Sequence, residues 1–211
     1  DFYPSVAIQA LMGIFRDPAL AVHHGMVVQA VMFIFQSLGL GCCPYLPKVV
    51  PHMIFAVKTC EPFSLRESLL MQLATLSTIV RDHIGPFLPD LLDLAEQFWS
   101  SRYASTVFSL VSNLAAGSPD DFRRVVPRLI RRVLATLEGI NIADWSSTGH
   151  RVTVLGRGRS DSEKLRLLLK LVCNLKFVVT DYLHIIIPAL MSLADSLASV
   201  SLTDDSGLPT S

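Results

Sequence analysis

Apolar residues recur at intervals of three and four along almost the whole chain. No stretch of four or more residues alternates convincingly between apolar and polar positions, which is the pattern of a half-buried strand. The pattern therefore predicts an all-helical protein.

Nine helices are expected from this periodicity and from the Gly, Pro and Asp residues that separate them. The first six cover about residues 4–16, 21–38, 45–59, 64–82, 87–99 and 104–116, the seventh about 120–137, and the last two about 161–179 and 181–199. Most connections are short, which favours antiparallel neighbours. The exception is the segment 139–160, which carries no helical pattern.

A proline-containing motif repeats among these helices. Residues 45–53 (YLPKVVPHM) return in related form as 87–94 (FLPDLLDL), 125–130 (VVPRLI) and 182–190 (YLHIIIPAL). The first two intervals are 42 and 34 residues, and the third is 39 after the irregular 139–160 segment is subtracted from 61. Repeats of about 34 to 47 residues with two helices each are typical of HEAT and armadillo proteins. Pro51, Pro127 and Pro188 lie deep enough to kink or locally unwind their helices.

The repeats predict an all-α, HEAT-type α-solenoid of about four helical pairs plus a leading helix. A four-helix bundle with accidental proline matches is the alternative. In the solenoid, residues 1–199 form one HEAT-repeat segment, 139–160 are an irregular insertion loop, and 200–211 are a polar tail that we expect to be flexible. Because the chain starts at Asp1 without Met, we expect it to be a segment of a longer protein.

Composition narrows the class of protein further. Apolar residues make up 51% of the chain and charged residues 17%, against about 25% charged in an ordinary soluble domain. This excludes intrinsic disorder and suggests that neighbours cover part of the surface. The 18 basic and 18 acidic residues cancel, which argues against nucleic-acid binding.

Membrane and export signals are weak. The uncharged run 26–43 is near the minimum length for spanning, but Gln29, Gln36 and Ser37 interrupt it, so no transmembrane segment is expected. The first residues carry no basic region of a secretory signal. We therefore expect a cytoplasmic location.

No catalytic motif is found. The segment 156–159 (GRGR) lacks the Gly-Lys-Ser/Thr ending of a phosphate-binding loop. The four cysteines form no Cys-x-x-Cys pair, and the histidines show no recurrent metal-ligand spacing. We expect this segment to have no enzymatic activity, no bound cofactor or metal, and no small-molecule substrate.

Five arginines gather on one half of the seventh expected helix, opposite its apolar residues, on a wheel of about 100° per residue. They are Arg123, Arg124, Arg128, Arg131 and Arg132. This basic face is a candidate docking surface for an acidic partner or a phosphorylated segment. An ordinary solvated face is the alternative.

Two serines are candidate phosphorylation sites. Ser160 and Ser162 follow Arg157 and Arg159, a pattern similar to the acceptor site of a basophilic kinase. A phosphate would add about −1.5 to −2 charge beside the start of the next helix. An unmodified insertion loop is the alternative.

Several stretches of the chain are similar to a known family. Residues 1–12 (DFYPSVAIQALM), 16–18 (RDP), 27–35 (VVQAVMFIF) and 37–40 (SLGL) resemble the HEAT-repeat region of target of rapamycin (TOR) kinases. The segments 46–53, 83–86, 98–99 and 181–188 fit the same resemblance. It is weaker from 100 to 137, and 139–160 departs from it.

The resemblance implies a piece of the solenoid that precedes the kinase domain in this phosphatidylinositol-3-kinase-related family. In that family the solenoid supports dimerisation and accessory-subunit docking, so the expected function is a non-catalytic scaffold in growth and nutrient signalling. The expected partners are a Raptor-like or Rictor-like scaffold and a second parent chain.

The same resemblance places ATP and Mg in the kinase domain of the parent serine/threonine kinase. It also allows a peripheral association with endomembranes through the parent complex. The alternative is a HEAT-repeat adaptor of another large assembly, such as a transport receptor or a phosphatase scaffold. A kinase domain downstream in the parent chain would separate the two.

Overall fold

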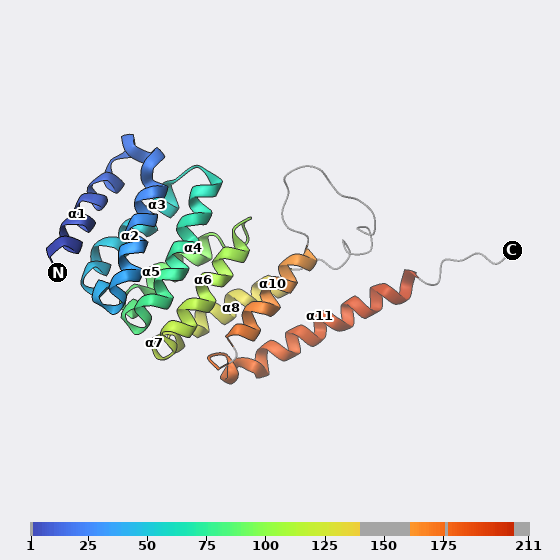
Figure 1. Cartoon of the computed structure of the whole chain (residues 1–211). Coiled ribbons are helices and arrows are strands. Elements are labelled where there is room, and N and C mark those ends of the chain that lie inside the picture. Colours follow the sequence, from blue (N-terminus) through green and yellow to red (C-terminus); the bar gives the residue numbers. More distant parts are fainter. Residues whose placement is uncertain (1, 140–160, 176, 205–211) are drawn as a thin grey trace. The chain divides into compact units, whose positions relative to one another are not determined.

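The computed structural model describes residues 2–139, 161–175 and 177–204, and every regular element in these ranges is an α-helix or a 3₁₀ helix (Figure 1). The all-α prediction is therefore confirmed. The chain divides into two compact units, Asp1–Arg124 and Val125–Ser211. Each unit is described by itself.

The first unit is built from seven α-helices joined in part by 3₁₀ segments. The α-helices are α1 (Phe2–Arg16), α2 (His24–Leu38), α3 (Leu46–Thr59), α4 (Phe63–Val80), α5 (Leu88–Gln97), α6 (Ala104–Gly117) and α7 (Pro119–Arg123), and the 3₁₀ helices are η1 (Pro18–His23), η2 (Gly39–Tyr45) and η3 (Arg81–Phe87). The first six predicted helices agree with these bounds to within a few residues.

The two joints α2–η2–α3 and α4–η3–α5 are copies of each other. Each begins at a residue with positive φ, Gly39 (φ 55°) and Arg81 (φ 49°), whose N–H donates to a carbonyl of the last helical turn. Each continues through a seven-residue 3₁₀ helix into a helix that starts Leu-Pro. Because proline lacks an N–H, it fits the first turn of a helix, where that donor has no helical acceptor. The joints are 42 residues apart, as the repeated motif predicts.

Helices α2, α4 and α6 lie side by side in one layer. A Cβ on Gly25 would approach Leu65, 40 residues on, at 3.5 Å. Between α4 and α6, Thr106 donates to Glu67 (3.4 Å) and Asn113 donates to the carbonyl of Ala74 (3.1 Å). The separation is 39 residues at both of these contacts, so α4 and α6 run parallel and in register, and it is 40 residues between Gly25 of α2 and Leu65 of α4. This confirms a repeat of two helices, in the HEAT manner.

A second layer is formed by α1, α3 and α5, since α3 contacts both α1 and α5. The core lies between the layers and contains Phe35, Val50, Leu70 and Leu76, each at most 1% exposed. Fully burying such a side chain contributes about 1.5–3 kcal/mol. The first unit is therefore an α-solenoid held together mainly by its interlayer core.

Arg66 closes the end of α3. Its guanidinium donates to the carbonyls of Val57 (2.9 Å) and Cys60, and to the hydroxyl of Tyr103 (3.3 Å). The last carbonyls of a helix lack helical donors, so a half-buried arginine that satisfies them links α3 to the following repeat.

The second unit contains α8 (Val126–Glu138), α10 (Asp161–Asn174), η4 (Thr180–Tyr182) and α11 (Leu183–Asp204), and α8 packs against α11. α10 ends five residues before the predicted 179. α11 continues to Asp204, beyond the predicted start of the polar tail at 200. Of the predicted insertion 139–160, residues 140–160 lie outside the described residues, and of the predicted tail 200–211, residues 205–211 do.

The expected seventh helix, 120–137, is wrong as a single element. α7 ends at Arg123 and α8 begins at Val126. Pro127 has no N–H to donate to the carbonyl four residues earlier, and its ring clashes with that carbonyl, so the helix is interrupted. The predicted unwinding therefore occurs at Pro127, whereas α3 and α11 continue through Pro51 and Pro188.

One stretch of the described chain, His24–Thr59, is long and apolar enough to cross a membrane by length and composition. It consists of α2, η2 and α3, and the chain turns at Gly39. Each of the two α-helices is shorter than the roughly 20 residues that a membrane span needs.

Candidate interaction surfaces

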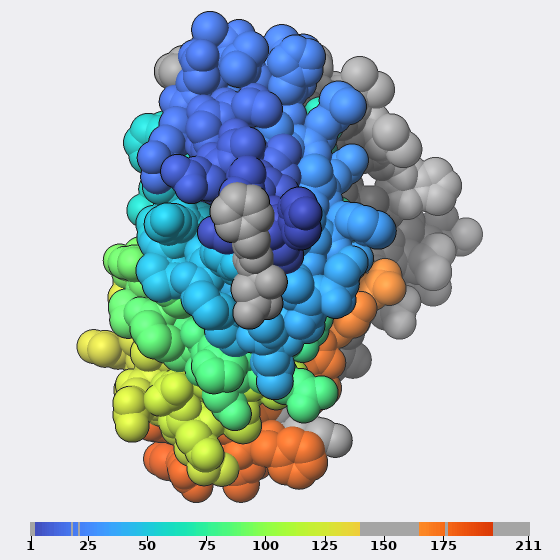
Figure 2. Space-filling view, turned by 60° about the vertical axis from the view of Figure 1, so that its left-hand side comes forward, coloured from blue at the N-terminus to red at the C-terminus, as the bar shows by residue number. Residues whose placement is uncertain are grey.

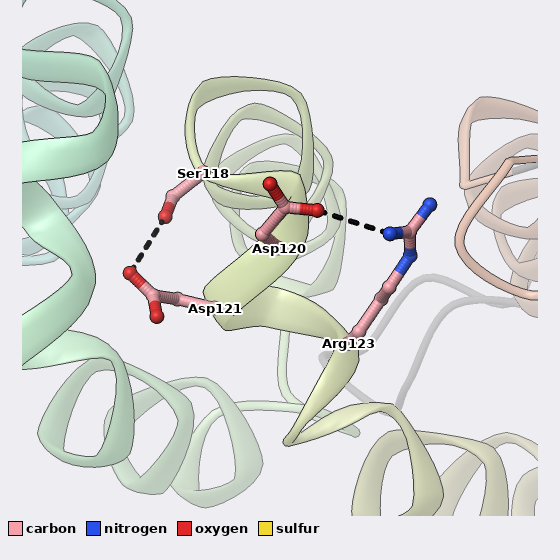
Figure 3. A network of polar contacts seen from close by, with 4 residues as sticks. All are labelled: Ser118, Asp120, Asp121 and Arg123. Carbon is pink, nitrogen blue, oxygen red and sulfur yellow. Dashed lines mark hydrogen bonds and ion pairs between the residues drawn. The ribbon is translucent and has the colours of Figure 1, made fainter.

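The first part of the predicted basic face consists of Arg123, the last residue of the short helix α7 (Figure 3), and Arg124, which follows it. Arg123 forms an ion pair with Asp120 at 3.0 Å, and Arg124 forms one with Asp121 at 3.2 Å. Ser118, the residue before α7, donates to the carboxylate of Asp121 at 3.3 Å. Both arginines are exposed, but each is paired with an acidic residue of its own segment.

The second part of the basic face lies on α8, in the second unit. Arg128, Arg131 and Arg132 are all exposed, and the Nε of Arg131 donates to the carbonyl of Pro127 (3.3 Å). The opposite side of α8 is buried and consists of Val126, Leu129, Ile130, Val133 and Leu137. α8 is therefore an amphipathic helix with a basic outer side.

The five arginines do not share one helix. Their common face follows from a wheel drawn over an unbroken helix, and the break between α7 and α8 removes that premise. Only Arg128, Arg131 and Arg132 keep the predicted relationship. We call these three residues the α8 basic face.

The two candidate phosphorylation sites stay predictions. Ser160 lies outside the described residues. Ser162 lies in the first turn of α10, where the structure describes its backbone and leaves its side chain undescribed.

The four cysteines are, by residue type, possible metal ligands or reactive thiols. Within the described ranges, no group of three or more His, Cys, Asp or Glu side chains could hold a metal ion. Burial, and to a smaller extent the neighbouring Cys43, raises the pKa of the Cys42 thiol to about 11. Burial also raises the pKa of Cys60, although Arg66 opposes the shift. A thiol that stays protonated near neutral pH is a weak nucleophile, which favours a structural role for Cys42.

A groove that the sequence analysis missed lies in the first unit. It encloses about 860 Å³ between the end of α1, the start of α2 and one side of α3. Arg16, His24 and His52 line it together with several apolar side chains. The spacing of the histidines gives no ligand signal, because the residues come together only through packing of three helices. The exposed Phe55 is a signal that could have been noticed: at the predicted register it falls beside His52 on one side of its helix.

Comparisons with known proteins show to which family the chain belongs. Residues 1–81, which span α1 to the end of α4, match the family model described as the serine/threonine-protein kinase mTOR domain. The chain is 36% identical over 198 residues to the serine/threonine-protein kinase mTor of Drosophila melanogaster, with 93% of the chain and 7% of that protein covered. The chain belongs to the TOR family.

Plant relatives agree with this assignment. The chain is 39% identical over 150 residues to the serine/threonine-protein kinase TOR of Oryza sativa subsp. japonica, covering 65% of the chain and 6% of the relative. The TOR kinase of Arabidopsis thaliana is 33% identical over 220 residues, with 97% and 8% covered. The chain therefore spans 6% to 8% of the length of these TOR kinases.

The match to the mTOR domain model lies within the first unit, whose N-terminal helices are blue in Figure 2. It includes the whole lining of the groove, from Phe15 to Pro62. It ends before α7 and α8, so the arginines of the predicted basic face lie outside the match.

Proposed function

We propose that this chain is a non-catalytic scaffold segment of a TOR-type serine/threonine protein kinase. Its role is to present helical surfaces for assembly of the kinase complex in growth and nutrient signalling. The observation that carries the proposal is the alignment of nearly the whole chain with TOR kinases, joined to a parallel two-helix repeat with a constant separation of 39 to 40 residues. Stacked helical repeats form extended surfaces for binding proteins.

The proposed partners are a second parent chain and an accessory scaffold of the Raptor or Rictor type. ATP and Mg belong to the kinase domain of the parent chain, and this segment holds neither. The parent complex works in the cytoplasm and at endomembrane surfaces. The family assignment favours this role over that of an adaptor in a transport or phosphatase assembly.

The α8 basic face is the part of this segment that we propose for an acidic partner. Its three arginines project from one helix whose other side is buried. Charged residues on a solvent-exposed helix face can steer and orient an oppositely charged partner. An ordinary solvated face would not respond to charge reversal.

The test is affinity capture of the full-length parent from its native cell, with mass spectrometry of the retained proteins. Reversal of Arg128 and Arg131 to Glu should abolish recovery of one partner. The matched control is reversal of Arg166 and Lys170 on α10, which are also exposed and change the net charge by the same amount.

Two results would count against these proposals. Equal recovery of every partner by the α8 and α10 variants would show that the α8 basic face is only solvated. Recovery of transport cargo or a phosphatase core, with neither a second parent chain nor an accessory scaffold, would contradict the TOR scaffold itself.

A further inference from the structure

The groove in the first unit has an aromatic wall and a concave shape. Phe15, Pro51 and Phe55 are among the apolar residues that line it. Phe15 is buried, whereas Phe55 is 66% exposed. Binding sites typically combine such an apolar wall with a few fixed polar groups. The groove has both.

The polar side of the groove is centred on Arg16. Its Nε donates to Nε2 of His52 (2.8 Å), and Nδ1 of His52 lies 2.5 Å from the carbonyl of Lys48. Because Nε2 accepts a hydrogen bond, the proton of the neutral ring is on Nδ1, which donates to that carbonyl. His52 thus holds the guanidinium from one side through its Nε2.

The rest of the guanidinium is available for a ligand. Within the described part of the chain, Arg16 forms no ion pair, and its side chain is exposed. His24 is engaged elsewhere, since its Nε2 lies 3.1 Å from the carbonyl of Asp17 and its ring packs against Phe15 (centroids 5.0 Å apart). Two terminal nitrogens of a fixed guanidinium match the two oxygens of a carboxylate.

Within the described residues, the stacked helices leave this groove open. α1 already contacts both α2 and α3, so it occupies the place that a preceding helix of the same layer would take beside α3. The groove opens on the exposed side of α3, which also carries Lys58 and Thr59. A surface of this kind is available to a separate segment of protein.

We propose that the groove binds a peptide segment with one acidic side chain next to a large apolar side chain. The carboxylate pairs with Arg16, and the apolar side chain packs against Phe55 and Pro51. Glu61 lines the same groove and is the second charged residue in it. Its negative charge disfavours a polyacidic or doubly charged phosphate ligand. This inference concerns a site separate from the α8 basic face and does not rest on the proposed scaffold role.

The test uses full-length protein and an array of ten-residue Gly/Ser peptides. Each peptide carries one Glu and one Phe separated by one to four residues, and binding is measured by fluorescence anisotropy. We expect at least one peptide to bind with a dissociation constant below about 1 mM. Arg16→Gln should weaken that binding by about tenfold to a hundredfold, because the carboxylate loses a charge-assisted pair. Replacement of the peptide Glu by Gln should weaken binding to the wild type by a similar factor.

Matched variants separate the groove from the general surface. Phe55→Ser should weaken binding by about tenfold, whereas Phe33→Ser, at an equally exposed Phe on α2 outside the groove, should leave it unchanged. Arg123→Gln should also leave it unchanged. Circular dichroism establishes that each variant is folded.

Three outcomes would overturn the proposal. The first is that no peptide of the array binds. The second is that Arg16→Gln binds as tightly as Arg123→Gln. The third is that a phosphoserine peptide binds more tightly than its Glu counterpart, which would contradict the preference for a single carboxylate.

Discussion

The layer of α2, α4 and α6 and the segment that contains α7 and α8 use their side chains in opposite ways. The three helices of the layer hold only two charged residues, Arg66 and Glu67, and both are half-buried and hydrogen-bonded. The α7–α8 segment has five exposed arginines and a helix break.

This difference shows which part of the fold is fixed by close packing and which part tolerates substitution. Close packing in the layer fixes the separation of 39 to 40 residues between neighbouring helices. Exposed charges contribute little to stability, because water and salt screen them. We therefore expect substitutions in the layer to change stability, and substitutions on the exposed arginines to change binding instead.

The largest effect is expected from Leu76→Ala in α4. Leu76 is completely buried, so its truncation leaves a cavity and should lower the free energy of unfolding by about 2–5 kcal/mol. The control is Leu40→Ala, since Leu40 is 54% exposed and should change stability by less than about 0.5 kcal/mol. Urea unfolding followed by circular dichroism measures both. Equal losses would show that the interlayer core is not where the structure places it.

The second-largest loss of stability is expected from a substitution where α6 lies close to α4. A Cβ on Gly117 would lie 2.9 Å from the backbone carbonyl oxygen of Ser77, so Gly117→Ala forces the helices apart and should cost about 1–3 kcal/mol. The matched control is Gly13→Ala in α1, where a Cβ meets nothing within 4 Å. There the gain in helix propensity should stabilise the chain by up to about 1 kcal/mol.

Opposite signs for the two Gly→Ala variants in thermal unfolding would confirm the tight α4–α6 contact. A stabilising Gly117→Ala would contradict it.

A smaller effect, a gain in stability, is expected from a substitution at the joint after α4. Arg81 has φ 49° and ψ −126°, a conformation that glycine adopts with less strain, and Gly39 has nearly the same angles in the preceding joint. Arg81→Gly should therefore raise the free energy of unfolding by about 1 kcal/mol. Gly39→Ala should lower it by a similar amount. A loss of stability in Arg81→Gly, measured by the same urea titration, would contradict the equivalence of the two joints.

The smallest effect is expected at the ion pair between Arg123 and Asp120, whose side chains are 62% and 92% exposed. Arg123→Ala should change stability by less than about 0.5 kcal/mol, as for other exposed pairs three residues apart. A double-mutant cycle with Asp120→Ala measures the coupling. A coupling energy above about 1 kcal/mol would show that this segment is less tolerant than the comparison implies.

Much of the fold could be predicted because it depends on local patterns. Apolar spacing located the helices, and the recurring Leu-Pro motif located the repeat, since both reflect one chain segment at a time. The helix break before Pro127 was harder to predict. In the structure Pro127 stands in the first turn of α8, as Pro47 does in α3 and Pro89 in α5, whereas Pro51 lies inside α3. The sequence pattern matches Pro127 with Pro51, and so it does not show that a new helix begins at Val126.

The candidate sites were less predictable for the same reason. The wheel that grouped Arg123 with Arg128 needs an unbroken helix, which the sequence pattern alone does not guarantee. The groove depends on Arg16 and His52, which are 36 residues apart and meet only when α1 packs beside α3. Contacts over such separations carry no periodic signal.

The central claim is that this segment is a scaffold within a TOR-type kinase complex. Electron cryomicroscopy of the full-length parent in its native complex tests it most directly. We expect to find α2, α4 and α6 as a parallel layer, with a second parent chain or an accessory subunit in contact with the helices of this segment. An ordered kinase complex in which neither a second parent chain nor an accessory subunit touches residues 2–204 would contradict the claim.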